Sequence, residues 1–178
     1  MSNGVRFQVA LPGDAPAICD LVNSAYRGEG SKRGWTTEAD LLDGQRTDLA
    51  GIEDILSASD QIILTARTGT ADEIVGCVNL VKQGGACYLG MLTVNPLGQG
   101  QGLGKGLMAQ AESWAREQKC QSIRMTVITL RKELLEFYVR RGFTRTGELS
   151  PFPYGDERFG APRRTDLAFE TLVKAINP

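Results

Sequence analysis

From residue 61 onward, the apolar residues come in short runs that turn residues separate. The runs are QIILTA (61–66), EIVGCVNLV (73–81) and ACYLGMLTV (86–94), and TGTAD and KQGG lie between them. Short runs that are rich in β-branched residues are typical of strands, and short connections favour antiparallel pairing. Three consecutive antiparallel strands are therefore predicted. Further strands are predicted at 5–10, where the alternation is weak, at 122–128, and at 166–173, where the alternation is clear.

In three other segments the apolar residues recur with the 3.6-residue period of a helix. The first segment follows Asp14, a candidate N-cap. The second follows a run of glycines, and the third ends at Gly142, a typical residue at a helix C-terminus. The apolar faces consist of Ile18, Leu21, Val22, Ala25 and Tyr26; of Leu103, Leu107, Met108, Ala111, Trp114 and Ala115; and of Leu134, Phe137 and Tyr138. Three amphipathic helices are predicted.

Two shorter helices are predicted between the first helix and the strand at 61–66. Thr37 and Asp40 have the spacing of a capping box, which predicts a helix that carries Leu41 and Leu42. Further on, Thr47 or Asp48 is expected to open a helix. Its apolar side consists of Leu49, Ile52 and Leu56.

The chain of 178 residues has the size of one domain. Its 42% apolar and 23% charged residues are close to the average of globular proteins. A net charge of −1 argues against a nucleic-acid partner. Because we find neither an export signal nor an apolar run long enough for a membrane span, we expect a cytoplasmic protein with no membrane partner.

Cysteine and histidine usage narrows the chemistry further. The four cysteines, Cys19, Cys77, Cys87 and Cys120, are scattered and form no CxxC pair, which favours reduced thiols in the cytoplasm. The chain has no histidine. This absence excludes Ser-His-Asp and Cys-His catalysis and histidine-based zinc sites, and no metal cofactor is expected.

The segment NPLGQGQGLGKG (95–106) places five glycines between a predicted strand and a predicted helix. Asn95-Pro96 ends the strand, because proline has no N–H for the ladder. Glycines lack Cβ and adopt positive φ, so that successive amides can converge on a ligand that comes close. The helix N-terminus adds unpaired amides and a partial positive charge. Together these features favour binding of a diphosphate.

The spacing of the glycines separates three motifs. A Walker A loop needs glycine where Gln99 stands and Ser or Thr where Gly106 stands. A GxGxxG fingerprint fails in each register that starts at Gly98, Gly100 or Gly102. The motif that remains is QxxGxG, from Gln99 to Gly104, at the start of a helix.

Two segments resemble the GNAT superfamily of acetyl-CoA-dependent N-acetyltransferases. LTVNPLGQGQGLGKGLM (92–108) is similar to the family's Asn/His-Pro followed by Arg/Gln-x-x-Gly-x-Gly/Ala, and EFYVRRGF (136–143) resembles its Leu/Phe-Tyr-x-x-x-Gly-Phe segment. The resemblance extends over residues 5–173. It implies an α/β (α+β) fold, one domain over 1–178 with a mixed, mostly antiparallel sheet of about seven strands and about four flanking helices.

The resemblance also implies a reaction, in which the acetyl group of acetyl-CoA passes by direct attack to a primary amine of a small molecule or peptide. The strand that ends at Val94 would then separate from the strand at 122–128, and its free amides would bind the pantetheine arm. The implied coenzyme-binding residues are Leu92, Thr93, Val94, Gln99, Gly100, Gln101, Gly102, Leu103, Gly104 and Lys105. Lys105 either neutralises phosphate or points to water.

For the chemical step, the resemblance implies Tyr138 as the general acid, since a phenol can give its proton to the departing thiolate. The alternative for Tyr138 is a core aromatic residue. The general base stays open among Glu73, Glu29 and a water relay. Arg131 stands where many family members have asparagine, and it either meets a coenzyme phosphate or faces solvent.

The acceptor is less defined. Residues 28–60 contain eight acidic and three basic residues, which would attract a cationic amine if they lined its groove, although solvated helix faces explain the same counts. Trp35 either lines that groove or packs on a helix. Phe152 and Tyr154 either wall the acceptor site or contact the partner in a homodimer. The alternatives to an enzyme are a noncatalytic acyl-CoA-binding sensor and a structural domain that uses the fold for dimerisation.

Overall fold

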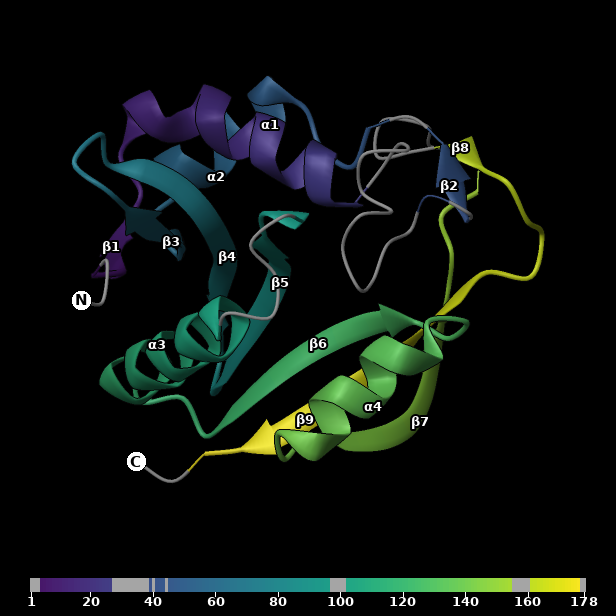
Figure 1. Ribbon diagram of the computed structural model, residues 1–178. Coiled ribbons are helices and arrows are strands. Elements are labelled where there is room, and N and C mark those ends of the chain that lie inside the picture. Colours follow the sequence, from purple (N-terminus) through teal and green to yellow (C-terminus); the bar gives the residue numbers. More distant parts are fainter. Residues whose placement is uncertain are drawn as a thin grey trace.

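A seven-stranded sheet organises the computed structural model, which describes residues 4–26, 39, 41–43, 45–96, 102–154 and 161–176. The strands follow the order β1-β3-β4-β5-β6-β9-β7, and every pair is antiparallel except β5 and β6. Their bounds are β1 Arg6–Val9, β3 Gln61–Thr68, β4 Glu73–Gln83, β5 Ala86–Val94, β6 Ser122–Ile128, β7 Thr144–Pro151 and β9 Ala168–Ala175. The predicted mixed, mostly antiparallel sheet is confirmed (Figure 1).

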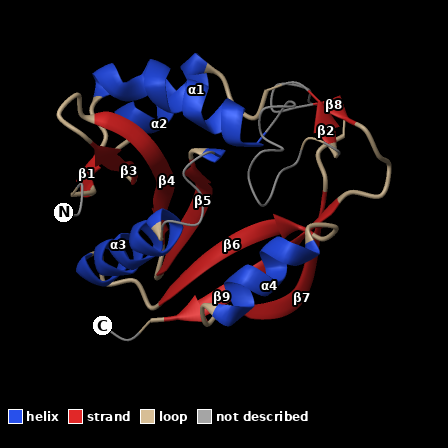
Figure 2. Cartoon of the chain, in the orientation of Figure 1, coloured by secondary structure: helices blue, strands red, loops and turns tan. Residues whose placement is uncertain are grey.

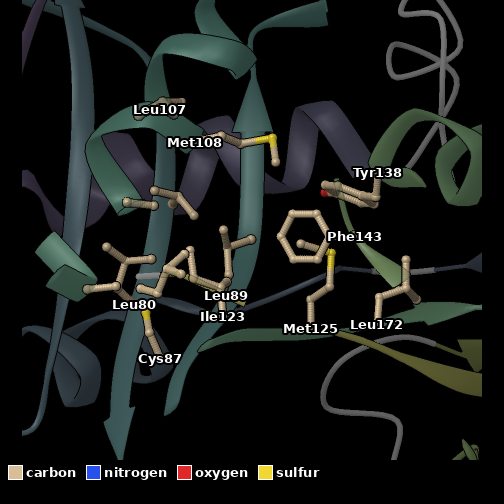
Figure 3. Close-up of a cluster of buried hydrophobic side chains, with 14 of the residues drawn as sticks. Leu80, Cys87, Leu89, Leu107, Met108, Ile123, Met125, Tyr138, Phe143 and Leu172 are labelled. Carbon is tan, nitrogen blue, oxygen red and sulfur yellow. The ribbon is translucent and has the colours of Figure 1, made fainter. Parts of the chain in front are cut away.

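Helices cover both faces of the sheet (Figure 2). The described helices are α1 Ala15–Tyr26, α2 Leu49–Ser57, α3 Leu103–Glu117 and α4 Lys132–Arg140, and a 3-10 turn, η1 Pro12–Asp14, precedes α1. On one face, Ile18 of α1 and Ile52 of α2 pack with Ile63 of β3. On the other face, α3 and α4 share a larger apolar cluster with β3 to β6 and β9 (Figure 3). Adjacent strand residues alternate between these two cores.

Most of the predicted elements are confirmed, but the helix predicted around Leu41 and Leu42 is wrong. Leu42 instead belongs to a short strand, β2 Leu42–Asp43, which pairs with β8 Ala161–Pro162. Leu42 is buried beside Ile128 and Leu167, so that a distant partner, which no local pattern reveals, decides its conformation. Thr37 and Asp40 lie outside the described residues.

The strand β7 was not predicted from the sequence. Almost all of its side chains are exposed, so it lacks the alternation that marks a half-buried strand. Its position at the edge of the sheet depends on β9, where Glu170 accepts hydrogen bonds from Arg145 at 2.6 and 2.9 Å. An edge strand tolerates the polar sequence and the terminal Pro151.

Asp14 does not cap α1 in the predicted way. Its carboxylate accepts a hydrogen bond from the Leu11 N–H at 2.8 Å and another from the buried Arg67 of β3 at 2.5 Å. Arg67 also pairs with Asp72 at 3.0 Å. Burial opposes ionisation of Asp14, but the hydrogen bonds from Arg67 and the Leu11 N–H and the charge of Arg67 together outweigh it and hold the pKa of Asp14 below its usual value. The start of α1 is thus tied to the middle of the sheet.

The strands β5 and β6 begin side by side and then diverge (Figure 1). They pair in parallel only from Ala86↔Ser122 to Tyr88↔Arg124. A bulge interrupts the β4–β5 ladder between Cys77 and Asn79, and the bulged strand contains Met91 at φ 52°. A bulge bends its strand and increases the local twist. The second half of β5 therefore turns away from β6, and the sheet opens in its middle.

Candidate functional site

Two cavities meet where β5 and β6 diverge. The first, called here the α3 cavity, has a volume of about 330 Å³ and is bounded by the end of β5, the start of α3 and one side of α4. The second, the β6 cavity, has a volume of about 280 Å³ and lies along residues 125–128 of β6. Five residues line both: Tyr26, Leu92, Arg131, Leu134 and Tyr138. The two cavities thus reach one point from opposite sides.

The structure brings together the predicted site residues that it describes. All of them line the α3 cavity, namely Leu92, Thr93, Val94, Gly102, Leu103, Gly104, Lys105 and Tyr138. Gln99, Gly100 and Gln101 lie outside the described residues. Residues as far apart in sequence as Leu92 and Tyr138 therefore converge on one cavity.

The start of α3 presents backbone donors to this cavity. Gly102 is the N-cap and has a left-handed conformation with φ 79° and ψ 8°, which glycine adopts without strain. The first amide of the helix that bonds back is Gly106, whose N–H donates to the Gly102 carbonyl at 3.0 Å. The N–H groups of Leu103, Gly104 and Lys105 precede it, and amides at these positions have no intrahelical acceptor. This end of α3 suits an anion.

The charges around the α3 cavity have one sign. Within the described ranges its lining includes Lys105, Arg131 and Arg141 but no aspartate or glutamate. Arg141 is held in place, because its guanidinium carbon lies 3.6 Å from the centroid of the Phe137 ring and its Nη1 donates to the Phe137 carbonyl at 3.1 Å. Lys105 and Arg141 also border a second hollow, where Arg140, Lys174 and Glu112 lie and Lys174 pairs with Glu112. The positive lining complements a polyanionic ligand.

One glycine of the same motif has a packing role. A Cβ on Gly106 would lie 2.6 Å from Cζ of Phe7 on β1, closer than real Cβ atoms approach a neighbour. Gly102 and Gly104, by contrast, have no neighbour closer than 3.9 Å to such an atom. The glycine-rich stretch therefore combines a turn that opens a cavity with a contact that seats α3 on β1.

The end of β5 is held by α1. The Tyr26 hydroxyl donates to the Leu92 carbonyl at 2.6 Å, and the Asn95 N–H donates to the Val75 carbonyl of β4 at 2.8 Å. Because backbone groups alternate in direction along a strand, the N–H and carbonyl of Leu92 point away from β4. The Thr93 side chain is buried and donates to the Met91 carbonyl at 2.8 Å. If residues 92–94 bind the coenzyme as predicted, their backbone groups would make the contacts.

Tyr138 combines both of the alternatives considered for it. Its side chain is 5% exposed, and its ring makes edge-to-face contacts with Phe137 at 5.3 Å and Phe143 at 5.7 Å. It nevertheless lines both cavities, and in Figure 3 its ring extends from α4 with the hydroxyl at the far end. Burial raises the pKa of this phenol, and nearby Tyr26 adds to the rise, while Arg131 and Arg141 oppose it. The hydroxyl therefore keeps its proton at neutral pH.

Arg131 does not face solvent, because it is only 4% exposed. It precedes α4, and its carbonyl accepts hydrogen bonds from the N–H groups of Leu134 and Leu135, both at 3.1 Å. Its guanidinium carbon lies 5.8 Å from the centroid of the Tyr26 ring. A positive charge is thus fixed beside the point where the two cavities meet.

Of the two candidate carboxylate bases, Glu73 does not lie at this point. Glu73 borders a different hollow, beside Asp14 and Arg67, and Glu29 lies outside the described residues. Among the described residues, no aspartate or glutamate lines either cavity. The structure describes no cluster of three or more metal-ligating side chains either.

The aromatic residues expected to flank the acceptor groove have different positions in the structure. Phe152 lines the β6 cavity and stacks on Phe169, with 5.6 Å between the ring centroids. Tyr154 lies beside Phe152, and its hydroxyl accepts a hydrogen bond from the Leu167 N–H at 2.8 Å. Trp35 lies outside the described residues. A homodimer contact stays a prediction.

Sequence reasoning missed Tyr26, Arg46 and Leu134 as cavity residues. Tyr26 and Leu134 were recognised only as members of apolar helix faces, and Arg46 only as one of three bases in an acidic region. None of them stands in a motif. Their positions depend on how α1, α4 and the segment before α2 pack around the opening between β5 and β6.

A sequence model of the acetyltransferase (GNAT) family matches residues 16–143, from α1 to just past α4. The chain belongs to this family. The opening between β5 and β6 and both predicted motifs lie within the matched region of the acetyltransferase. No helix within its described ranges is both long and apolar enough to cross a membrane.

Solved structures show the same fold for the acetyltransferase. Nourseothricin acetyltransferase is 20% identical with a TM-score of 0.66, and the match covers 96% of this chain and 98% of that one. The ribosomal-protein-S18-alanine N-acetyltransferase from Escherichia coli is 11% identical with a TM-score of 0.71, covering 98% and 96%. PaiA N-acetyltransferase from Thermoplasma acidophilum, solved with coenzyme A, is 14% identical with a TM-score of 0.68, covering 97% and 99%. No curated protein matches the sequence.

Proposed function

We propose that this acetyltransferase binds acetyl-CoA in the α3 cavity and transfers its acetyl group to a primary amine that enters through the β6 cavity. The observation that carries the proposal is that the two cavities share Tyr26, Leu92, Arg131, Leu134 and Tyr138. Two substrates that enter from opposite sides would meet there. Direct attack of one on the other needs such a shared point.

Acetyl-CoA fits the residues of the α3 cavity. The amides that open α3 and the charges of Lys105 and Arg141 suit its diphosphate. The opening between β5 and β6 leaves backbone groups of β5 available to the amide-containing pantetheine arm. We assign coenzyme binding to Leu92, Thr93, Val94, Gly102, Leu103, Gly104 and Lys105, and we extend the assignment along the sequence motif to Gln99, Gly100 and Gln101.

The Leu92 N–H, which points away from β4, donates to the thioester oxygen in this proposal. A backbone donor aimed at a developing oxyanion contributes about 3 to 4 kcal/mol to lowering a barrier. The buried charge of Arg131 stabilises the same negative charge, since it lies beside both cavities. Polarisation of the carbonyl thus comes from two elements, β5 and the start of α4.

The amine nitrogen attacks the carbonyl carbon, a C–N bond forms and the C–S bond breaks. Tyr138 gives its hydroxyl proton to the departing thiolate, and the proton that the amine loses passes to water, which restores the phenol. A raised pKa makes a phenol a weaker acid, but the same desolvation makes a thiolate more basic. Because no carboxylate within the described ranges lines either cavity, we favour water over a side-chain base.

The four cysteines form no disulfide. Unpaired thiols are typical of proteins in a reducing compartment. We therefore propose that the acetyl transfer takes place in the cytoplasm.

A comparison of Tyr138→Phe with Tyr88→Phe tests the proposal. Tyr88 lies on β5 but lines neither cavity, so its variant controls for the loss of a hydroxyl. Tyr138→Phe is expected to lower kcat for thiol release about 100-fold or more, with the Kd for acetyl-CoA unchanged. Equal thiol release by the two variants would remove Tyr138 as the acid.

The same assay separates the two rival functions. A noncatalytic sensor would bind acetyl-CoA and release no thiol with any amine. A purely structural domain would show no thermal shift, whereas a ligand at 100 times its Kd adds about 2.7 kcal/mol to the free energy of unfolding. A thermal shift together with amine-dependent thiol release supports the enzyme.

A further inference from the structure

The acid-rich region at 28–60 does not give the β6 cavity an acidic lining within the described residues. Asp48 caps α2 by accepting a hydrogen bond from the Gly51 N–H at 2.7 Å, and Glu53 and Asp54 lie exposed on that helix. Among the described residues, the charged ones that line the cavity are Arg46 and Arg131. Two positive charges favour an acceptor that carries an anionic group besides its amine.

Arg46 is anchored through its backbone next to the start of α2. Its N–H donates to Oδ1 of Asn23 at 2.7 Å, and the next residue, Thr47, exchanges two hydrogen bonds of 3.0 Å with the same asparagine. The Arg46 guanidinium lies 5.6 Å from the centroid of the Tyr26 ring. Across the described ranges no carboxylate forms an ion pair with it.

Two guanidinium groups therefore gather around one aromatic ring. The carbons of both, Arg46 at 5.6 Å and Arg131 at 5.8 Å, lie within 6 Å of the Tyr26 centroid. Glu133 approaches Nε of Arg131 at 3.9 Å, and an anion that lay near both guanidinium groups would be attracted by two positive charges. The planar guanidinium is also the side chain best matched to a carboxylate, which it binds through two parallel hydrogen bonds.

The rest of the β6 cavity is apolar. Met125, Val127 and Ile128 of β6 are buried, and Phe152 and Phe169 stack against each other at its edge. Such a wall suits a hydrocarbon or aromatic side chain. The cavity therefore offers an anion site and an apolar wall, both next to Leu92 and Tyr138.

We infer that the acceptor of this acetyltransferase is an amine that also carries a carboxylate and an apolar side chain, that is, an apolar amino acid. This inference rests on the proposed function. The carboxylate binds Arg46 and Arg131, the side chain packs on Phe152 and the β6 residues, and the amine lies at the thioester. The step is the one described above, and its products are the N-acetylamino acid and the free thiol of the coenzyme.

A paired panel of acceptors tests the inference, with thiol release from acetyl-CoA as the readout. Leucine and phenylalanine are compared with 3-methylbutylamine and phenethylamine, which lack only the carboxylate. The amino acids are expected to have a kcat/KM about 10- to 100-fold higher, as for other hydrogen bonds between charged groups. Equal or better turnover of the decarboxylated amines overturns the inference and leaves the acetyltransferase function in place. Thiol release with no amine at all would contradict the proposed function instead.

Variants of Arg46 test whether this residue causes the preference for acceptors with a carboxylate. Arg46→Gln is expected to abolish the preference for the carboxylate while the KM for acetyl-CoA stays unchanged, and Arg46→Lys should restore part of it. Arg116→Gln, which removes an exposed arginine of α3 outside both cavities, serves as the matched control. A preference that survives in Arg46→Gln contradicts the assignment.

Binding without turnover gives an independent measurement. The carboxylate 4-methylpentanoate, which is leucine without its amine, should inhibit competitively against the amine acceptor. Its inhibition constant should rise about 10-fold or more in Arg46→Gln. Inhibition that competes with acetyl-CoA, or that does not depend on Arg46, would overturn the inference.

Discussion

The α3 cavity and the β6 cavity differ in how they are built, although they share five residues. Eight of the described residues that line the α3 cavity are residues 92–94, residues 102–105 and Tyr138. All eight were found from sequence motifs. The β6 cavity takes its lining from the end of α1, β2, the segment before α2, β5, β6, α4 with the residue before it, the start of the chain after β7, and β9. In the proposed function, the coenzyme common to the family would thus be bound by local motifs, and the acceptor by side chains from many elements.

The two cavities also differ in the groups that face the ligand. Backbone amides and the conformation of Gly102 are prominent in the α3 cavity, and backbone groups are insensitive to most substitutions. The β6 cavity presents apolar side chains and two guanidinium groups, which substitutions alter directly. Changes in the β6 cavity should therefore affect acceptor kinetics alone, and changes at the start of α3 should affect the coenzyme alone.

The largest difference between the effect on acceptor kinetics and the effect on coenzyme kinetics is expected for Phe152→Ala. Phe152 stacks on Phe169 and lines only the β6 cavity. Loss of its apolar contact with the acceptor is expected to raise the KM for the amine about 10- to 100-fold, the equivalent of burying one such side chain. The KM for acetyl-CoA should stay within about twofold, which steady-state kinetics with each substrate varied in turn would show.

Leu149→Ala is the matched control for Phe152→Ala, since Leu149 is an apolar residue of β7 that is 63% exposed. It should change neither KM. If Phe152→Ala raised the two KM values in parallel, the division of labour between the cavities would be wrong.

A smaller effect, on coenzyme binding and not on the acceptor, is expected for Gly102→Ala. At φ 79° an alanine pays roughly 1 to 2 kcal/mol, so the N-terminal turn of α3 should rearrange. The Kd for acetyl-CoA is expected to rise about 5- to 30-fold, as measured by calorimetry. The KM for the amine should change little.

Gly84→Ala separates backbone strain from ligand binding. Gly84 also has a positive φ, 57°, with open space around it, and it lies in the turn between β4 and β5, outside both cavities. This variant should lower the melting temperature and leave the Kd for acetyl-CoA unchanged. Weaker coenzyme binding in Gly84→Ala would mean that global destabilisation, not the turn before α3, explains the Gly102 result.

The smallest expected effect concerns pH and Tyr138, one of the five residues that the two cavities share. Because burial raises the pKa of Tyr138 above the usual value of about 10, the phenol stays protonated and able to donate throughout the neutral and moderately alkaline range. The rate should rise with pH as the acceptor amine loses its proton and should show no fall up to about pH 10. A pH profile of kcat, with circular dichroism to follow folding, would measure this.

A fall in kcat between pH 9 and 10 that is present in the wild type and missing in Tyr138→Phe would contradict this expectation. Such a fall would show a phenol that ionises in its ordinary range. Tyr88→Phe again serves as the control, because its hydroxyl lies outside both cavities.

The sequence by itself determined the elements whose signals are local. The runs at 61–94 alternate around short turns and form β3, β4 and β5, and the helical periodicity after the glycines forms α3. Asp48 caps α2 as one of the two predicted residues. Gly102 and Tyr138 were found through motifs. A helix start that a ligand approaches closely requires glycines at nearby positions, and the tyrosine stands at a fixed distance from a Gly-Phe pair.

Only the tertiary structure decided the rest. The strand β2 forms because β8 lies beside Leu42, and β7 forms because β9 offers it a ladder. The left-handed conformation of Met91 and the divergence of β5 from β6 arise from a bulge against β4. Arg46 and Arg131 meet at the Tyr26 ring although 85 residues separate them in sequence. Such contacts depend on chain segments that are brought together only by folding, so no local pattern encodes them.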